Sequence, residues 1–547
     1  MNKNPTTLKI LSYDIPFSDD EKKPLYVRND NFNRNGGILE FSTYFNAVSV
    51  NKIRQYTNIV SIGYRYETNV SVISELVCYD DKRNETVIAE SCSCGSSGIS
   101  VDINSIPDNS TLAYLRLRAV EEGAELLRCE TFYEGVSLCG SPDIALITCT
   151  YKREEYIKRN AQYIIENTRR NNLPFTLIVV DNGKTIHRED LPEEAVLIPN
   201  DNTGGSGGFS KGMQQASAMK RFTHFVNMDD DISLDISSLQ KLYILLYFIK
   251  PEYADLSVSG AMLYLDKPCI QFEAGGKFNT DNGKQVGYGY LTDLSEKDNI
   301  AENEAPRDIN YGGWWFMCMP IKYIDQGNLP LPFFIKYDDV EYALRCQLRI
   351  ITLNGICVWH EKFENKFNSS AVYYNTRNYL HLCSIYCKNF SNGTAKKFLR
   401  RNVIEHSCRQ QYKMAQAVIL GYDHYRLGLD YLYHIDQEAT HIAVSKLNYN
   451  MFSLDSEMSG YSSDLLYENY MQCNSAPYKS YMRFFIFGQI IPRFLCKKEM
   501  CVTDAFFDRK ELYWRRKTAL HCNFSLNTGY KTEKSTAKCI SLMLKTI

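Results

Sequence analysis

The chain has 547 residues, which is too long for one ordinary hydrophobic core and favours two to four domains. Its 62 basic and 64 acidic side chains almost balance, so charge gives no support for a nucleic-acid partner. The first twenty residues lack a continuous apolar segment, and with 18 cysteines this favours reduced thiols in a cytoplasmic protein. The sequence contains no Cys-x-x-Cys pair, which argues against a structural zinc site.

The longest apolar stretch, residues 481–496, is interrupted by Arg483, Gln489 and Pro492. It is shorter than the ~20 residues that a membrane-spanning helix needs. Peripheral contact of this basic and aromatic stretch with a membrane surface is left open.

Residues 1–140 are predicted to be rich in β-strands, in the pattern of a β-sandwich or jelly roll. Alternating apolar residues, separated by polar turn residues, occur at 41–50, 59–68, 71–80 and 112–120. The Cys-, Ser- and Gly-rich residues 92–98 are predicted to form a flexible turn.

From residue 141 the pattern changes to alternating strands and helices, which predicts an α/β sheet over 141–389. The expected elements are a buried strand at 144–151, a helix at 154–170, a strand at 176–183, a helix ending near 220 and a strand ending at 231. Ligands of such sheets bind beyond the carboxyl ends of the strands, where this chain carries Arg153, Asp181, Asn202 and Asp229. Long amphipathic runs predict a mainly helical domain over 390–547.

Three consecutive aspartates, Asp229 to Asp231, end the last of these strands. Alternate carboxylates of an extended chain point to the same side, so Asp229 and Asp231 can share one divalent cation. Apolar neighbours make the alternative, a solvated acidic turn, the weaker interpretation. His360 ends a later apolar strand, and its imidazole is a candidate third ligand, although a single histidine is more often structural.

The glycine-rich segment 202–212, NTGGSGGFSKG, precedes a predicted helix. It could cradle a phosphate at the helix N-terminus, but its spacing matches neither the dinucleotide-binding nor the P-loop pattern. A tight turn between strand and helix explains the glycines equally well, so both interpretations stay open.

Two later motifs carry further candidates. Trp314 and Trp315 follow two glycines and could either form a platform for a sugar or fill the core. Asp338 and Glu341 are three residues apart at a predicted helix start, and Asp339 points elsewhere from the same turn. Helix capping explains one of these acids but not all three, and an ionised carboxylate here could act as a general base.

These motifs together, in this order and spacing over residues 145–365, resemble the GT-A type, family 2 galactofuranosyltransferases, in particular the bifunctional enzymes that polymerise cell-surface galactan. The motifs are CTYKR, VDNG, NTGGSGGFSKG, MDDDI, YGGWWFMCMP, PLPFFIKYDDVEYALR and VWHEKF. The first 140 residues also look like the β-sandwich that precedes the catalytic domain in that family.

The resemblance implies an inverting transfer of galactofuranose from UDP-galactofuranose to a glycan or lipid-linked glycan of the cell envelope, with Mn²⁺ or Mg²⁺ as cofactor. It places Asp339 as the base. The roles that it implies for the other residues are metal binding for Asp229, Asp231 and His360, nucleotide binding for Arg153, Asp181, Asn202, Gly204, Gly205 and Asp230, and acceptor or donor sugar binding for Trp314, Trp315, Asp338 and Glu341.

The chain departs from the family at two positions near the sugar or phosphate site. Phe363 stands where such enzymes have a tryptophan, and Asn375, in YNTRN, stands in place of the FHLRN motif. Alternatives are therefore a family 2 transferase for a rhamnosyl or pyranosyl donor and a non-catalytic carbohydrate-binding protein. Related enzymes form rings, so a homo-oligomer is also left open.

Overall fold

A computed structural model describes residues 9–14, 21–325, 327–366, 368–458, 464–468, 471, 493–504 and 516–547. The chain forms two compact units. The first unit comprises Met1–Phe278, Gln285–Pro330 and Asp339–Glu361, and the second comprises Asn279–Lys284, Leu331–Asp338 and Lys362–Ile547. Most of the apolar stretch at 481–496, up to residue 492, lies outside the described residues.

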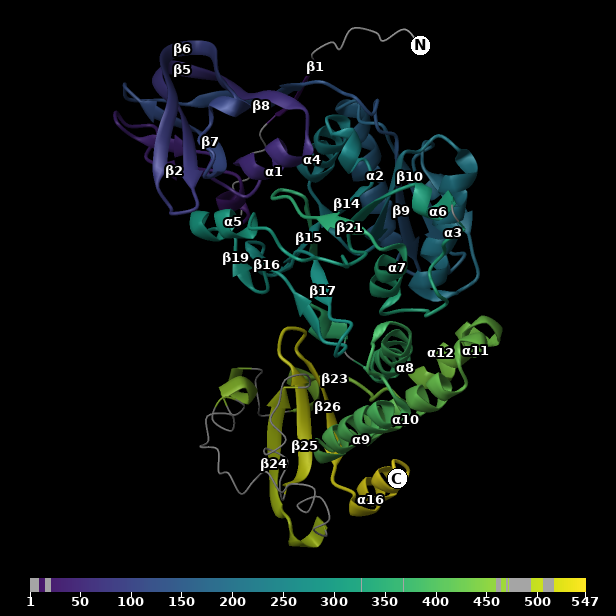
Figure 1. Ribbon diagram of the computed structural model, residues 1–547. Coiled ribbons are helices and arrows are strands. Elements are labelled where there is room, and N and C mark those ends of the chain that lie inside the picture. The colour runs from purple at the N-terminus through teal and green to yellow at the C-terminus, as the bar shows by residue number, and fades with distance from the viewer. Residues whose placement is uncertain are drawn as a thin grey trace. The chain divides into compact units, whose positions relative to one another are not determined.

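The N-terminal part of the first unit is an eight-stranded sheet with the order β1-β8-β5-β7-β3-β2, in which β6 also pairs with β5 and β4 with β7 (Figure 1). Its elements are β1 (Lys9–Asp14), β2 (Arg28–Asp30), β3 (Ile38–Glu40), β4 (Val48–Ser49), α1 (Val50–Tyr56), β5 (Ile59–Asp80), β6 (Glu85–Asp102), β7 (Ser110–Ala119) and β8 (Leu126–Gly135). The predicted sandwich is therefore joined by hydrogen bonds into one sheet, because β5 pairs with β8 through its first half and with β7 through its second.

Local predictions in this region were partly wrong. Residues 59–68 and 71–80 form the single strand β5, and residues 92–98 belong to β6 rather than to a turn. Residues 41–47 form turns, with a strand of only two residues at Val48–Ser49. The side chains of Thr43 and Asn46 close these turns by donating to the carbonyl of Tyr26 at 2.9 and 2.6 Å.

The predicted α/β region contains a seven-stranded sheet with the order β11-β10-β9-β12-β20-β14-β21. Its elements are β9 (Ile144–Thr150), α2 (Glu154–Arg170), β10 (Phe175–Asp181), β11 (Val196–Pro199), α3 (Gly204–Met219), β12 (His224–Asp229), α4 (Ile236–Tyr247), β14 (Leu256–Ser259), β20 (Met317–Pro320), α6 (Lys322–Asp325), α7 (Asp338–Cys346) and β21 (Arg349–Ile351). Strands β9 to β12 are parallel, and Figure 1 shows α2 and α3 beside them. The alternating elements predicted from residue 144 to residue 231 are confirmed.

The chain passes from β9 outward to β10 and β11 and then returns to β12 on the opposite side of β9. Such a reversal opens a crevice at the carboxyl ends of the two central strands. Here those ends are Thr150 and Asp229, so the segments after them enter the crevice together.

A smaller five-stranded sheet, with the order β13-β22-β15-β16-β19, completes this region. Its strands are β13 (Ser233–Leu234), β15 (Ala261–Tyr264), β16 (Ile270–Glu273), β19 (Thr292–Asp293) and β22 (Cys357–His360), and nearby lie the hairpin strands β17 (Gly276–Phe278) and β18 (Gln285–Gly287) and helix α5 (Lys297–Asn303).

The first two predicted domains share hydrophobic core, which explains why they form one unit. Ile244 and Phe248 from α4 and its end pack with the N-terminal strands. Tyr114 of β7 lies in a cluster with Leu263 of β15 and Trp359 of β22. Burial of these side chains on both sides stabilises the two parts as one body.

The second unit contains a sheet as well as helices, a feature that the prediction of a mainly helical domain over 390–547 did not include. Its elements are α8 (Ser369–Tyr386), α9 (Asn392–Cys408), α10 (Tyr412–Arg426), α11 (Leu429–His434), α12 (Gln437–Ser445), β23 (Phe452–Ser453), α13 (Leu454–Glu457), β24 (Lys497–Asp504), β25 (Arg516–Asn523), β26 (Thr528–Glu533) and α16 (Thr536–Leu544). The last strands form a four-stranded sheet with the order β23-β26-β25-β24 (yellow in Figure 1).

The boundary predicted at residue 389 also differs. Helix α8 belongs to the second unit, because Tyr373, Tyr374 and Leu380 share a core with residues of α9 and α10. Within the described residues, no helix has the length and apolar character that crossing a membrane would require.

Candidate functional site

Asp229, Asp231 and His360 lie together, with ligand atoms that are all within 4.8 Å of one another. Asp229 ends β12, and Asp231 follows two residues later. Strand β13 then pairs antiparallel with β22, with Ser233 opposite Trp359, so His360 is placed beside the acidic segment. Its Nε2 lies 3.2 Å from Asp231 Oδ1 and 3.7 Å from Asp229 Oδ2.

The donor set of this cluster fits a divalent cation. His360 Nδ1 is 2.5 Å from the carbonyl oxygen of Glu361, which can only accept, so Nδ1 carries a proton, and Nε2 of the neutral ring is the nitrogen left to bind a metal. Two carboxylates and an imidazole nitrogen suit ions such as Mn²⁺. The His360 and Asp231 side chains are only 1% and 9% exposed, whereas Asp229 is 35% exposed, so the cluster opens on the Asp229 side.

The central aspartate, Asp230, has a different partner. Arg153 Nη1 donates to Asp230 Oδ1 at 2.9 Å and lies 2.8 Å from Asp231 Oδ2. Burial raises the pKa of Asp230, and the Arg153 charge opposes that rise. Burial lowers the pKa of Arg153, but Asp230 and Asp231 outweigh this effect and raise it. Part of the repulsion among the three aspartates is therefore offset by an arginine of the chain itself.

The resemblance implied a nucleotide-binding role for Asp181, but in the structure its carboxylate accepts hydrogen bonds from backbone N–H groups. It is 1% exposed and accepts hydrogen bonds from the N–H groups of Gly183, Thr185 and Ile186 at 2.9, 2.7 and 2.8 Å. These bonds close the loop after β10. Asp181 therefore shapes this end of the strand.

Asn202 and the glycine-rich segment start α3. Asn202 Oδ1 accepts from the Gly204 N–H at 3.3 Å, and Gly204 has a φ of +69°, a conformation that favours glycine. Asn182, which the sequence did not single out, donates from Nδ2 to the Gly204 carbonyl at 2.9 Å. Asn182 thus joins the end of β10 to the start of α3; its place after the VDNG aspartate was the only signal.

The remaining glycines of this segment lie inside α3 and allow it to pack closely. A Cβ at Gly208 would overlap Cys149 Sγ, and one at Gly212 would overlap the Ile147 side chain. Both partners belong to β9. Close helix-to-strand packing therefore accounts for Gly208 and Gly212, and only Gly204 and Gly205 lie at the N-terminus of α3.

Both tryptophans are largely buried. Trp314 is 6% exposed and makes edge contacts with Phe209 of α3 at 5.3 Å and with Tyr342 of α7 at 5.8 Å between ring centroids. Trp315 is 7% exposed, and its Nε1 donates to the Gly260 carbonyl at 2.9 Å. Trp314 thus connects the glycine-rich helix with the acidic helix.

The acidic group lies in the first turn of α7, as predicted. Asp338 is buried, and Asp339 is half-buried and accepts from the Val340 N–H at 2.8 Å. Glu341 is 1% exposed and pairs with Arg345 at 2.8 Å, which gives it a structural partner. Of the three, Asp339 has the most exposed side chain.

Glu273, at the end of β16, is a carboxylate that the sequence did not reveal. It is 9% exposed, and burial, followed by the charge of Asp339, raises its pKa to about 8. Nothing in the apolar strand around it indicates a charged neighbour. A carboxyl group whose pKa is strongly raised by burial and by a neighbouring charge is a common property of catalytic sites.

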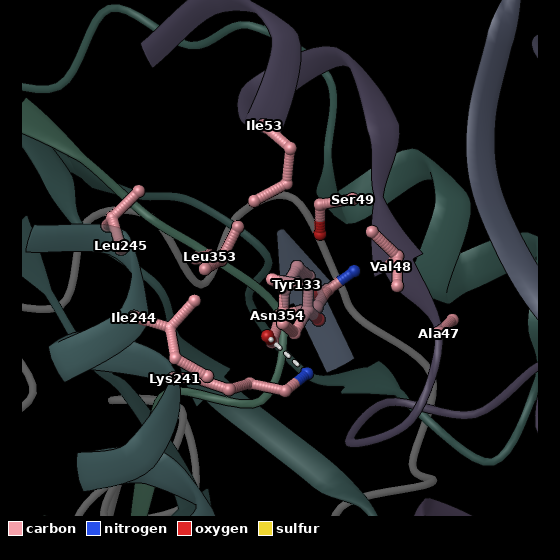
Figure 2. Close-up of a pocket in the computed structure, with 10 residues that line it drawn as sticks. All are labelled: Ala47, Val48, Ser49, Ile53, Tyr133, Lys241, Ile244, Leu245, Leu353 and Asn354. Carbon is pink, nitrogen blue, oxygen red and sulfur yellow. Dashed lines mark hydrogen bonds between the residues drawn. The ribbon is translucent and has the colours of Figure 1, made fainter. Parts of the chain in front are cut away.

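Figure 2 shows a cavity of about 20 Å³ away from this site, which suffices for about one water molecule. Lys241 enters it and donates to the Asn354 carbonyl at 3.3 Å, and burial lowers the pKa of this amine to about 8. The cavity is too small for a sugar nucleotide.

Comparisons with known proteins bear on the sequence resemblance. No protein-family model matches the chain. The chain is 27% identical over 230 residues to galactofuranosyltransferase GlfT2 of Mycolicibacterium smegmatis, which covers 39% of this chain and 35% of the relative. The chain is similar to galactofuranosyltransferases. It is 28% identical over 235 residues to GlfT2 of Mycobacterium tuberculosis, which covers 38% of this chain and 36% of the relative.

The chain thus spans about a third of the length of these galactofuranosyltransferases. Two solved structures overlap it as well. A mannosyltransferase from Pyrobaculum calidifontis in complex with GDP-Man and Mn²⁺ covers 63% of this chain and 86% of that chain, with 11% identity and a TM-score of 0.30. S. aureus TarS 1–349 covers 57% and 94%, with 12% identity and a TM-score of 0.31.

Proposed function

We propose that the chain is an inverting, metal-dependent GT-A glycosyltransferase that moves galactofuranose from UDP-galactofuranose to a hydroxyl of a cell-envelope glycan. The observation that carries the proposal is the cluster of Asp229, Asp231 and His360 at the crevice of the seven-stranded sheet. The similarity to galactofuranosyltransferases supports the donor sugar. The site of action would be the cytoplasmic side of the membrane.

Asp229, Asp231 and His360 would hold Mn²⁺ or Mg²⁺. When bound, such an ion supplies positive charge for the diphosphate of the departing nucleotide. Arg153, whose side chain is 40% exposed, lies next to this cluster and would face the nucleotide. Asn202, Gly204 and Gly205 would contribute backbone and amide groups at the N-terminus of α3, where negative charge is stabilised.

Asp339 would take the proton of the acceptor hydroxyl. The acceptor oxygen forms its bond to the anomeric carbon while the bond to the phosphate oxygen breaks, and the electron pair leaves with UDP. The first turn of a helix stabilises a carboxylate, and the ionised Asp339 contributes to the raised pKa of Glu273. One carboxylate is then available as a base while its neighbour stays largely protonated at neutral pH.

Asp339→Asn should abolish transfer while binding of Mn²⁺ and UDP is retained, because the amide cannot accept the proton. Asp229→Ala should abolish both transfer and metal-dependent UDP binding. The assay is UDP release from UDP-galactofuranose with synthetic glycan acceptors, alongside calorimetric titration of Mn²⁺ and UDP. Asp308→Asn, on a carboxylate that is 72% exposed, is the control and should behave as the parent.

Near-normal turnover of Asp339→Asn would disprove the base assignment. UDP-galactopyranose and dTDP-rhamnose tested in the same assay distinguish the donor sugar. Efficient turnover of either in place of UDP-galactofuranose would replace the proposed donor while leaving the reaction type intact.

A further inference from the structure

The segment that leads into α7 has an unusual backbone. Phe334, Lys336 and Tyr337 have φ values of +71°, +70° and +66°, which residues other than glycine rarely adopt. The Ile335 N–H also donates to the Phe333 carbonyl at 2.9 Å across Phe334, which is the γ-turn with a positive central φ, a rare and strained turn. Such a conformation persists only where surrounding groups hold it.

Two consecutive residues of α8, Arg377 and Asn378, hold this segment. Both are 0% exposed. Asn378 Nδ2 lies 3.0, 2.8 and 3.0 Å from the carbonyl oxygens of Phe333, Ile335 and Lys336, so its two hydrogens are shared among three acceptors. Arg377 Nη2 donates to the Phe333 carbonyl at 2.7 Å, so this oxygen accepts from three donors when the Ile335 N–H is included.

Arg377 also fixes the orientation of Asn378. Its Nε donates to Asn378 Oδ1 at 2.8 Å, which directs the amide nitrogen toward the three carbonyls. The guanidinium lies over the rings of Tyr373 and Tyr374, 5.3 and 5.1 Å from their centroids. Among the described residues it forms no ion pair with a carboxylate. A buried arginine is costly without one, and here hydrogen bonds from Nε, Nη1 and Nη2 and the two rings take the place of a carboxylate.

We propose that Arg377 and Asn378 are positioning residues for the transfer reaction, because they set the backbone that presents Asp339. The inference rests on the proposed function, in which Asp339 is the base. Lys336, whose carbonyl Asn378 holds, precedes Asp339 by three residues, and α7 begins at Asp338. The backbone of Lys336 and Tyr337 leads directly into Asp338 and Asp339, the first two residues of α7.

Asn378→Ala tests this role, with Gln411→Ala as a matched control. Gln411 is another buried amide of the second unit, 1% exposed, but it bonds to Tyr530 Oη and His406 Nδ1 at 2.8 and 2.9 Å. Asn378→Ala should lower kcat about a hundredfold, the effect of a displacement near 1 Å at a catalytic group, with KM for the donor changed by less than about twofold. Gln411→Ala should lower the thermal midpoint comparably and leave kcat within about twofold of the parent.

A rescue variant separates positioning from general damage. Lys336 is exposed, and glycine adopts its φ of +70° without strain. Adding Lys336→Gly to Asn378→Ala should therefore raise kcat about tenfold above that of Asn378→Ala. Without the strain at residue 336, the segment keeps its conformation with fewer hydrogen bonds. Arg377→Lys keeps the positive charge but loses the forked donors, so it should lower kcat about tenfold in a folded protein. It provides the test if Asn378→Ala does not fold.

A kcat for folded Asn378→Ala or Arg377→Lys equal to that of the Gln411→Ala control would overturn the positioning role. So would a failure of Lys336→Gly to restore any activity. Failure of the proposed function has a different signature. It would appear as turnover by Asp339→Asn, whatever Asn378→Ala does.

Discussion

The protonation of Glu273 predicts the direction and the magnitude of a change in the free energy of unfolding with pH. Its carboxyl group lies against Gly287 of β18, where any added Cβ would overlap Glu273 Oε2. Among the described residues, neither a hydrogen bond nor an ion pair satisfies this carboxylate. Burial and the nearby charge of Asp339 therefore raise its pKa from 4.5 to about 8. Glu273→Gln is the perturbation, because glutamine keeps the shape and stays neutral at every pH.

The direction follows from proton linkage. The unfolded chain releases the Glu273 proton near pH 4.5, whereas the folded chain keeps it until about pH 8. The contribution of Glu273 to the free energy of unfolding is thus fully present below pH 4.5. It falls by about 1.4 kcal/mol per pH unit as the pH rises and is lost once the pH has passed through about 8. Over the whole interval the loss is about 5 kcal/mol, and Glu273→Gln is free of it.

Urea unfolding of the parent and Glu273→Gln at pH 5, 6.5 and 8 measures this difference. The two proteins should be nearly equal at pH 5, and the variant should be the more stable by several kcal/mol at pH 8. In an Asp339→Asn background the gap should narrow, because one cause of the shift is removed. Parallel stability curves for the parent and Glu273→Gln across this range would refute the argument.

Two further predictions concern the crevice. Mn²⁺ at a hundred times its dissociation constant should stabilise the parent by about 2.7 kcal/mol. His360→Ala should abolish the resulting rise in the thermal midpoint, Asp308→Asn should retain it, and a parent indifferent to Mn²⁺ would contradict the metal assignment. Gly208→Ala should destabilise the chain by about 1–3 kcal/mol in urea unfolding, because its Cβ would overlap Cys149 Sγ. Cys149→Ala in the same chain should recover part of this loss, and strictly additive effects would argue against direct packing.

Periodicity predicted the elements that build the crevice because their burial follows the sequence pattern. Helix α2 begins at Glu154 and ends at Arg170 as expected, since acidic residues open it and basic residues close it. Elsewhere, pairing with a neighbouring strand determined the secondary structure instead of the local sequence. Residues 92–98 have poor strand propensity, yet they extend along β5 because the register continues through Gly95 and Gly98.

The contacts between residues far apart in the chain were the part of the site that the sequence could not predict. The pairing of Ser233 with Trp359 brings His360 to Asp231 across more than a hundred residues, and only the chemistry of the residue types suggested it. Glu273 gave no signal, since its raised pKa depends on burial and on Asp339. The strain before α7 was equally hidden, because Phe334, Lys336 and Tyr337 are not residues that predict a positive φ.

The three aspartates after β12 divide their partners in a way that repulsion alone does not require. Asp231 has one oxygen, Oδ2, 2.8 Å from Arg153 and the other, Oδ1, 3.2 Å from His360. Arg153 Nη1 therefore balances the charge of the buried Asp230 and also contacts the Asp231 oxygen that does not approach His360. Both contacts are made by the same guanidinium nitrogen, which carries two N–H donors. Asp229, the most exposed of the three metal-site residues, is then the one best placed to meet an incoming ligand.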